Sequence, residues 1–279
     1  MTRRFAGFAA ALSFLLAPYA FAQDVAQEMS HDMTMDMGGE DHDMMHEMMH
    51  GTDNGDFGPF DVEAWGVYSE LVETRRYTTN FFLHGLPYYD ITVAVGALTG
   101  LRGEVTVIDK EVIISYGGGS CADCPPKSEE ETTLLATASV SRWSDPIALP
   151  GTLSGPDLEK FILDQATMMG LAAGEPFPFR LQGTLVKAGM HVAKGPNPAF
   201  TGHGSTQTMA VMDVVESAAI GGEVIGFHSG EKLEGVISHP GERFHFHFVN
   251  AAHTATAHID SFGMAQGSQL RLPLPPPSR

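Results

Sequence analysis

Much of the chain after residue 90 consists of short apolar segments rich in β-branched residues, several with polar and apolar positions in alternation. Glycines, prolines and short polar runs separate these segments. The predicted strands cover residues 93–98, 104–116, 134–143, 179–186, 208–215, 223–227, 243–249 and 256–262. Successive side chains of a strand point to opposite faces, so this pattern predicts extensive β-sheet.

Two segments instead have apolar residues at helical spacing, in residues 65–77 and 155–170. Pro156 stands in the first turn of the second segment, where a missing backbone N–H does not interrupt a helix. A proline-rich stretch at residues 273–277 ends the predicted fold. Few helices among many strands predict an α+β or α/β fold with mixed, mostly antiparallel sheets.

Composition divides the chain into an N-terminal arm and a folded body. Of 34 acidic residues, 12 lie in residues 23–64, which contain no lysine or arginine. We expect this arm to be disordered, because it can bury too little apolar surface to offset the entropy of ordering it. Residues 65–279 are expected to form the folded domain. The formal net charge of −18 argues against a nucleic-acid partner, because binding phosphate groups needs a basic surface.

The first 22 residues have the features of a secretory signal peptide. Arg3 and Arg4 precede an apolar stretch at residues 5–18. Ala20 and Ala22 then offer the small residues that a signal peptidase reads. The alternative is an uncleaved membrane anchor, but the apolar stretch is short for a membrane span. We therefore expect an exported protein, periplasmic or extracellular, with no membrane contact once the signal is removed.

The arm is rich in groups that bind soft metals. Thioether and imidazole are ligands for copper, and the soft thioether favours Cu(I). We expect this segment to bind Cu(I) or silver; a flexible, acidic and oxidisable tail is the alternative. The eight methionines and four histidines are Met29, His31, Met33, Met35, Met37, His42, Met44, Met45, His46, Met48, Met49 and His50.

Cys121 and Cys124 form a C-x-x-C pair in a predicted loop at residues 117–131. Pro125 and Pro126 follow directly, so no helix starts there, which argues against a thioredoxin-type redox motif. Export places the pair in an oxidising compartment, where we expect a local disulfide that pins the loop. A metal-binding pair is the alternative.

The most informative chemical pattern lies in residues 243–248, where histidine and phenylalanine alternate. On a strand, His245 and His247 point to one face, and the phenylalanines point to the opposite, core-facing side. A short turn-like segment then allows the chain to return and bring His253 or His258 beside the pair. Three imidazoles with an open position are a catalytic arrangement for zinc. The alternative is a solvated strand face that carries histidines without a metal.

Several segments resemble acetolactate decarboxylases, in the order in which that family has them. They are residues 96–105, 178–184, 226–227, 234–236, 245–248 and 258–262. The resemblance implies the fold of that family and a catalytic zinc ion bound by His245, His247 and His258. It also implies that Glu104 supplies a carboxylate at the metal site.

Three features depart from the family pattern. His191 stands at about the position of the family's active-site arginine, and residues 250–257 differ from the polar segment between the second and third histidines. The stretch after Leu272 contains no glutamate, so the family's C-terminal glutamate is missing. We expect a protonated His191 to hold the substrate carboxylate, as a weaker substitute for an arginine that is always charged.

These features predict an exported metal-dependent carbon–carbon lyase that decarboxylates 2-acetolactate, or a similar 2-hydroxy-3-keto acid, to acetoin. Zn²⁺ or another divalent metal would act as a Lewis acid, and Glu104 would deliver the proton that completes the product. The expected partner is this small-molecule substrate, and a homodimer is the candidate assembly. The alternative is a non-catalytic exported protein on the same fold that binds copper or zinc, which His191 and the missing glutamate favour.

Overall fold

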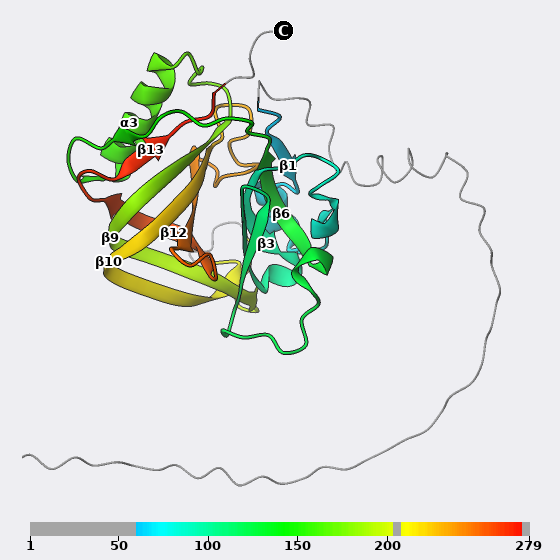
Figure 1. Ribbon diagram of the computed structural model, residues 1–279. Coiled ribbons are helices and arrows are strands. Elements are labelled where there is room, and N and C mark those ends of the chain that lie inside the picture. Colours follow the sequence, from blue (N-terminus) through cyan, green and yellow to red (C-terminus); the bar gives the residue numbers. More distant parts are fainter. Residues whose placement is uncertain (1–59, 203–207, 275–279) are drawn as a thin grey trace, which may run out of the picture. The chain divides into compact units, whose positions relative to one another are not determined.

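The computed structural model describes residues 60–202 and 208–274, and most of its strands belong to two antiparallel sheets (Figure 1). The first sheet has the strand order β1-β6-β3-β4-β5, and β2 pairs with β6. Its strands are β1 (Glu63–Trp65), β2 (Phe81–Phe82), β3 (Val93–Leu98), β4 (Gly103–Ile108), β5 (Glu111–Tyr116) and β6 (Glu131–Ala138).

The second sheet has the strand order β7-β13-β9-β10-β11-β12-β8. An additional pairing between β9 and β12 closes β9, β10, β11 and β12 into a ring of antiparallel pairs. Both edges of β9 and of β12 are therefore paired within this ring. The strands are β7 (Ile147–Ala148), β8 (Leu153–Ser154), β9 (Phe177–Pro196), β10 (Ala210–His228), β11 (Phe244–Asn250), β12 (Thr256–Met264) and β13 (Gln269–Arg271).

Two α-helices lie in the described part of the chain, α2 (Tyr68–Thr74) and α3 (Gly155–Met168). Pro156 is in the first turn of α3, as expected, and the helix buries Leu158 and Ile162 against the core. Neither helix is long and apolar enough to cross a membrane. Three short 3₁₀ helices are η1 (Leu83–Gly85), η2 (Thr99–Leu101) and η3 (Lys127–Glu129).

The expected fold class, mostly antiparallel sheets with few helices, is confirmed. Some boundaries differ from the prediction. Residues 104–116, expected as one strand, form the hairpin of β4 and β5. Asp109 and Lys110 form its two-residue turn with φ angles of 49° and 72°. Positive φ at both positions matches the twist of the flanking strands, so polar residues can turn the chain here without glycine.

A second difference concerns β10, which was expected as two separate strands at residues 208–215 and 223–227. The strand β10 instead continues through the glycines at 221 and 222. A Cβ atom at Gly222 would lie 2.4 Å from the Phe248 ring. The glycine therefore allows the ring of a neighbouring strand to pack against the β10 backbone, and it does not end the strand.

The main hydrophobic core contains side chains from both sheets. Val93 and Val95 of β3 belong to the same cluster of buried residues as Phe179 of β9 and Phe227 of β10. All four side chains are fully buried, so the two sheets share one dry interface. This interface holds β4 of the first sheet at a constant position relative to β11 and β12 of the second.

The folded body begins before residue 65. Phe60 and Val62 are buried in the core, and β1 pairs with β6 from Glu63 onward. The predicted signal peptide and residues 23–59 of the predicted arm lie outside the described residues. Binding of Cu(I) by the methionine- and histidine-rich segment therefore stays a prediction.

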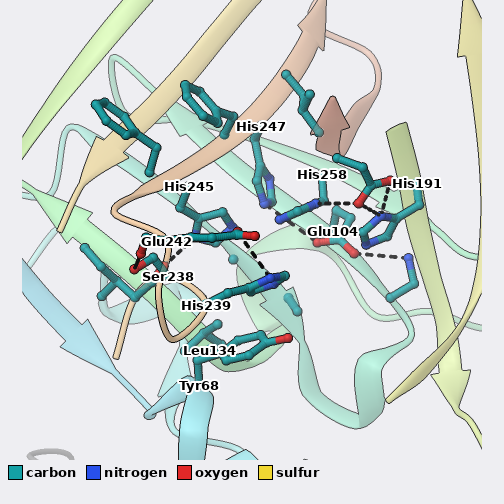
Figure 2. A pocket seen from close by; sticks show the side chains of 18 of the residues that line it. Tyr68, Glu104, Leu134, His191, Ser238, His239, Glu242, His245, His247 and His258 are labelled. Atoms are coloured by element: carbon teal, nitrogen blue, oxygen red, sulfur yellow. Dashed lines mark hydrogen bonds and ion pairs between the residues drawn. The ribbon is translucent and has the colours of Figure 1, made fainter. Parts of the chain in front are cut away.

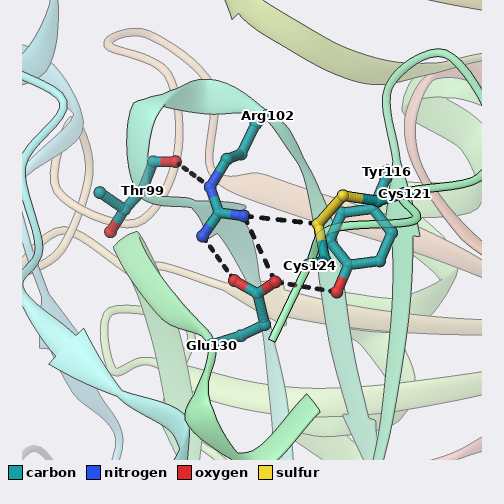
Figure 3. Close-up of a disulfide and its surroundings, with 6 residues drawn as sticks. All are labelled: Thr99, Arg102, Tyr116, Cys121, Cys124 and Glu130. Atoms are coloured by element: carbon teal, nitrogen blue, oxygen red, sulfur yellow. Dashed lines mark hydrogen bonds and ion pairs between the residues drawn. A yellow bond between two sulfur atoms is a disulfide. The ribbon is translucent and has the colours of Figure 1, made fainter. Parts of the chain in front are cut away.

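Cys121 and Cys124 form the expected local disulfide, with their Cα atoms 5.4 Å apart. The disulfide lies in the loop between β5 and β6, beside Arg102 and Glu130 (Figure 3). The Glu130 carboxylate is fully buried, and it accepts hydrogen bonds from the Arg102 guanidinium at 2.5 and 3.3 Å and from the Tyr116 hydroxyl at 2.9 Å. The buried charge is thus paired, which anchors the end of the loop next to the start of β4.

We predict that the Cys121→Ser/Cys124→Ser double variant keeps most of its stability. A disulfide restricts the unfolded chain less when the loop it closes is short, so the loss should be about 2 kcal/mol or less. Chemical denaturation measures it, with Asp123→Ser as a control in the same loop. A loss above about 4 kcal/mol, or loss of metal bound to the folded body, would contradict a purely local structural role.

Candidate metal centre and active site

Three neighbouring strands of the second sheet bring histidines into one row. On β11, His245 and His247 are two residues apart and share a face. His247 lies opposite His258 of the antiparallel strand β12, and His258 lies opposite His191 of β9. The same face of three paired strands therefore carries four imidazole groups, which line one cavity of about 930 Å³ (Figure 2).

The rings of the three predicted ligands are close neighbours. Ring centres are 5.0 Å apart for His245 and His247, 5.1 Å for His245 and His258, and 5.6 Å for His247 and His258. Metal–nitrogen bonds of roughly 2.0–2.1 Å place each ring centre about 3 Å from an ion, so three rings around one ion lie about 5 Å apart. The observed spacing matches that value.

A different trio meets the stricter condition that its potential ligand atoms all lie close together, which the predicted trio His245, His247 and His258 does not. In the described ranges, His191, His258 and Asp260 form the group of histidine and acidic residues whose ligand atoms all lie within 4.8 Å of one another. The His191 and His258 ring centres are 4.6 Å apart. The two candidate sets share His258 and differ in whether Asp260 binds a metal or orients the histidines beside it.

Glu104 reaches the same cavity from β4 of the first sheet. Its Oε2 atom is 3.8 Å from His247 Nε2, and its Oε1 atom accepts a 3.1 Å hydrogen bond from the backbone N–H of Ala193. Burial raises the pKa of Glu104 to about 7, although the nearby His191 and the Ala193 hydrogen bond lower it. The side chain is 3% exposed, so its carboxyl group meets the histidines in a nearly dry environment.

Hydrogen bonds at the Nδ1 atoms orient the rings of His245 and His247. His245 Nδ1 is 2.7 Å from the Ile237 carbonyl oxygen, so this nitrogen donates and Nε2 keeps its lone pair. His247 Nδ1 is 3.1 Å from the Thr106 hydroxyl, which is 2.6 Å from the hydroxyl of Thr256. His247 Nε2 is buried and has no hydrogen-bond partner among the described residues. Both rings therefore have a nitrogen left for a further ligand.

Burial keeps the proposed ligand imidazoles neutral. It lowers the pKa of His245 and His247 well below the usual value, and the neighbouring histidines lower both further. Burial also lowers the pKa of His258 to about 4, although Asp260 opposes this shift. Neutral imidazole is the form that binds a metal, so no proton has to be removed from these rings at neutral pH.

His191 has a different environment. Burial alone would lower its pKa, but the hydrogen bond to Asp260 and the charge of Glu104 outweigh burial, so the pKa of His191 is raised. Its Nδ1 atom is 2.9 Å from each carboxylate oxygen of Asp260. Burial would raise the pKa of Asp260, but the hydrogen bond from His191 and the neighbouring His258 ring hold this pKa below its usual range.

A loop between β10 and β11 supplies another wall of the cavity. The His239 ring of this loop is tilted against the Tyr68 ring, with ring centres 4.4 Å apart, and is parallel to the His258 ring, with ring centres 6.0 Å apart. Its Nδ1 atom is 3.4 Å from Glu242 Oε2. The cavity thus contains a second histidine–carboxylate pair, and Figure 2 shows Glu242 on the opposite side of the histidine cluster from His191.

The structure brings all five residues singled out in the sequence to this cavity: Glu104, His191, His245, His247 and His258. Of the two candidates for the third histidine, His258 lies in the cluster. His253 lies on the β11–β12 turn, where its Nδ1 atom is 3.0 Å from Glu111.

Three further residues of the site were not predicted. Asp260 and Thr106 each stand two residues beyond a predicted site residue on the same strand, so strand periodicity could have identified them. His239 lies in an irregular loop, where no periodicity places a side chain.

The fold and cavity define a mostly antiparallel β protein with a histidine-lined site between two sheets. The model of the alpha-acetolactate decarboxylase family matches residues 92–272, and the chain belongs to this family. No curated protein sequence matches the chain.

Two solved structures have a similar fold. Alpha-acetolactate decarboxylase from Bacillus subtilis strain 168 aligns with a TM-score of 0.61 at 14% identity, over 76% of this chain and 83% of that chain. Acetolactate decarboxylase from Bacillus subtilis subspecies spizizenii aligns with the same TM-score and identity, over 76% of this chain and 85% of that chain. At this identity the likeness shows the fold alone.

We predict that Thr106→Val destabilises the protein by about 1–3 kcal/mol, because it leaves His247 Nδ1 and the Thr256 hydroxyl buried without their partner. Thr133→Val is a matched control. Thr133 is equally buried, and its hydroxyl has no hydrogen-bond partner among the described residues. The control should be neutral or stabilising in urea denaturation. Equal effects of the two substitutions would show that the hydroxyl of Thr106 does not orient His247.

Proposed function

We propose that the chain is an exported, metal-dependent carbon–carbon lyase that decarboxylates 2-acetolactate, or a similar 2-hydroxy-3-keto acid, to acetoin. The observation that carries this proposal is the meeting of the buried His245 and His247 and the partly buried His258 with the Glu104 carboxyl group in one cavity. Membership of the alpha-acetolactate decarboxylase family supports the reaction class. The export assignment rests on the N-terminal 22 residues of the sequence.

In this proposal His245, His247 and His258 bind the metal, with Zn²⁺ as the first choice. The ring spacing fits one ion, and the buried His247 Nε2 has no hydrogen bond among the described residues. Three histidines also leave a position open for substrate. A divalent metal there supplies Lewis-acid chemistry, which withdraws charge from the substrate hydroxyl and ketone oxygens as carbon dioxide leaves.

We assign Asp260 to orientation instead of metal binding. Its carboxylate already accepts two 2.9 Å contacts from His191 Nδ1, and it is about 50% exposed at the rim. His247 by contrast is 0% exposed and His245 is 8% exposed. A metal held by His245, His247 and His258 provides a partner for His247 Nε2, a buried atom without a hydrogen bond among the described residues, which favours this set.

Glu104 is proposed as the acid that delivers the proton to the carbon that loses carbon dioxide. The role rests on its position, because Oε2 lies 3.8 Å from His247 Nε2 and the side chain belongs to the opposite sheet. A general acid must be within hydrogen-bond reach of the atom it protonates, directly or through one water molecule. His191, on the other side of His258, is proposed to hold the substrate carboxylate.

We predict that His247→Ala abolishes tight metal binding and acetoin formation. Metal content is measured by atomic emission after dialysis, and acetoin is followed colorimetrically with racemic 2-acetolactate. His253→Ala is the matched control, because His253 lies on the turn away from the cluster and pairs with Glu111. A His247→Ala protein that keeps its metal would sink the proposed ligand set. Metal-loaded wild-type protein that forms no acetoin would instead support the non-catalytic alternative.

We predict that Glu104→Gln keeps the metal and lowers kcat by about 10²–10⁴-fold, the usual contribution of a general acid. The amide has the same shape and can still meet the backbone N–H of Ala193 through its oxygen atom. Metal content and kcat are measured on the same preparation. Undiminished acetoin production by this variant would remove Glu104 from the mechanism.

A further inference from the structure

Asp260 stands between a proposed metal ligand and the residue proposed to hold the substrate carboxylate. His191 Nδ1 is 2.9 Å from both oxygens of this carboxylate, and His258 Nδ1 is 3.5 Å from one of them. Figure 2 shows the His258 ring beside His191, with interactions that join both rings to one carboxylate. A single acidic side chain therefore contacts the same ring nitrogen of two adjacent histidines.

The strand geometry explains this arrangement. Asp260 is two residues after His258 on β12, so both side chains share a face. His191 lies opposite His258 on β9, and the β9–β12 register shifts between Ile259 and Ser261. This irregularity occurs at Asp260, which can therefore reach His191 across the strands as well as His258 along its own strand.

His258 Nδ1 needs such a partner. The atom is buried, and it has no partner at full hydrogen-bond geometry among the described residues. The Asp260 carboxylate at 3.5 Å is the acceptor toward which it is turned. In metal sites, a ligand histidine almost always donates its other ring N–H to a carboxylate, carbonyl or water, which sets the tautomer and the ring orientation.

We propose that Asp260 is a positioning residue that turns the Nδ1 edges of His191 and His258 toward itself, so that the opposite edges of both rings face the cavity. This inference rests on the proposed function, because it assigns His258 to the metal and His191 to the substrate. One carboxylate then couples the two halves of the site: it orients a metal ligand through one oxygen and a substrate-binding ring through both.

The experiment compares Asp260→Asn with Asp213→Asn. Asp213 is a similar control, since it is a partly exposed carboxylate on β10 with a side-chain exposure of 38% against 50% for Asp260. It pairs with Lys194 and does not line the cavity. Zn²⁺ affinity and stoichiometry are measured by competition with a chromophoric chelator, and KM and kcat are measured with racemic 2-acetolactate.

We expect Asp260→Asn to bind the same number of Zn²⁺ ions with an affinity 10–100-fold weaker, the usual effect of removing the partner of a ligand histidine. KM should rise more than kcat falls, because His191 loses its orientation. In a His191→Gln background, Asp260→Asn should no longer change KM but should still weaken Zn²⁺ binding, because the two effects act through different rings. Asp213→Asn should leave all four quantities unchanged.

Two results would overturn the proposal. An Asp260→Asn protein with wild-type Zn²⁺ affinity would show that Asp260 does not orient His258. Complete loss of metal in Asp260→Asn, together with normal metal content in His247→Ala, would make Asp260 a ligand beside His191 and His258. Failure of the proposed function itself has a different signature, because it appears in the His247→Ala and wild-type measurements.

Discussion

The site depends on the burial of His247 against a strand of the opposite sheet. Thr106 and Glu104, two residues apart on β4, contact the two ring nitrogens of His247 at 3.1 and 3.8 Å. Strand periodicity puts both side chains on one face of β4, so one strand of the first sheet meets both edges of the ring. Any shift of one sheet against the other would leave polar groups unpaired in a dry interface. The site therefore forms only when the two sheets pack in this relative position.

The same burial determines which groups are charged. Burial lowers the pKa of His245, His247 and His258 and raises the pKa of Glu104 to about 7. Three neutral imidazoles and a carboxyl group that readily holds a proton add little charge to a cavity whose lining also includes Glu159, Asp260, Glu242 and Arg243. Neutral imidazoles do not repel a divalent cation.

The alternation of histidine and phenylalanine predicted the shared face of His245 and His247, and a hairpin return predicted a third histidine. Spacing could not choose between His253 and His258, because the choice depends on where β12 begins to pair. The approach of Glu104 depends on packing between sheets, and the partnership of His191 with Asp260 depends on the β9–β12 register. Local periodicity contains neither relation, so the family resemblance, and not the strand pattern, indicated Glu104 and His191 in the sequence.

Glu104 and Asp260, the two acids that contact the histidines, differ in exposure and in which protonation state their surroundings favour. Glu104 is 3% exposed and approaches the ring nitrogen His247 Nε2, where burial favours its protonated form. The Asp260 side chain is 50% exposed and approaches Nδ1 atoms, where hydrogen bonds favour its charged form. A proton donor has to be protonated before the reaction, while a carboxylate that orients imidazole N–H groups has to stay ionised. Their environments push the pKa values of the two groups apart, so exchanging Asp and Glu between the positions would not exchange their roles.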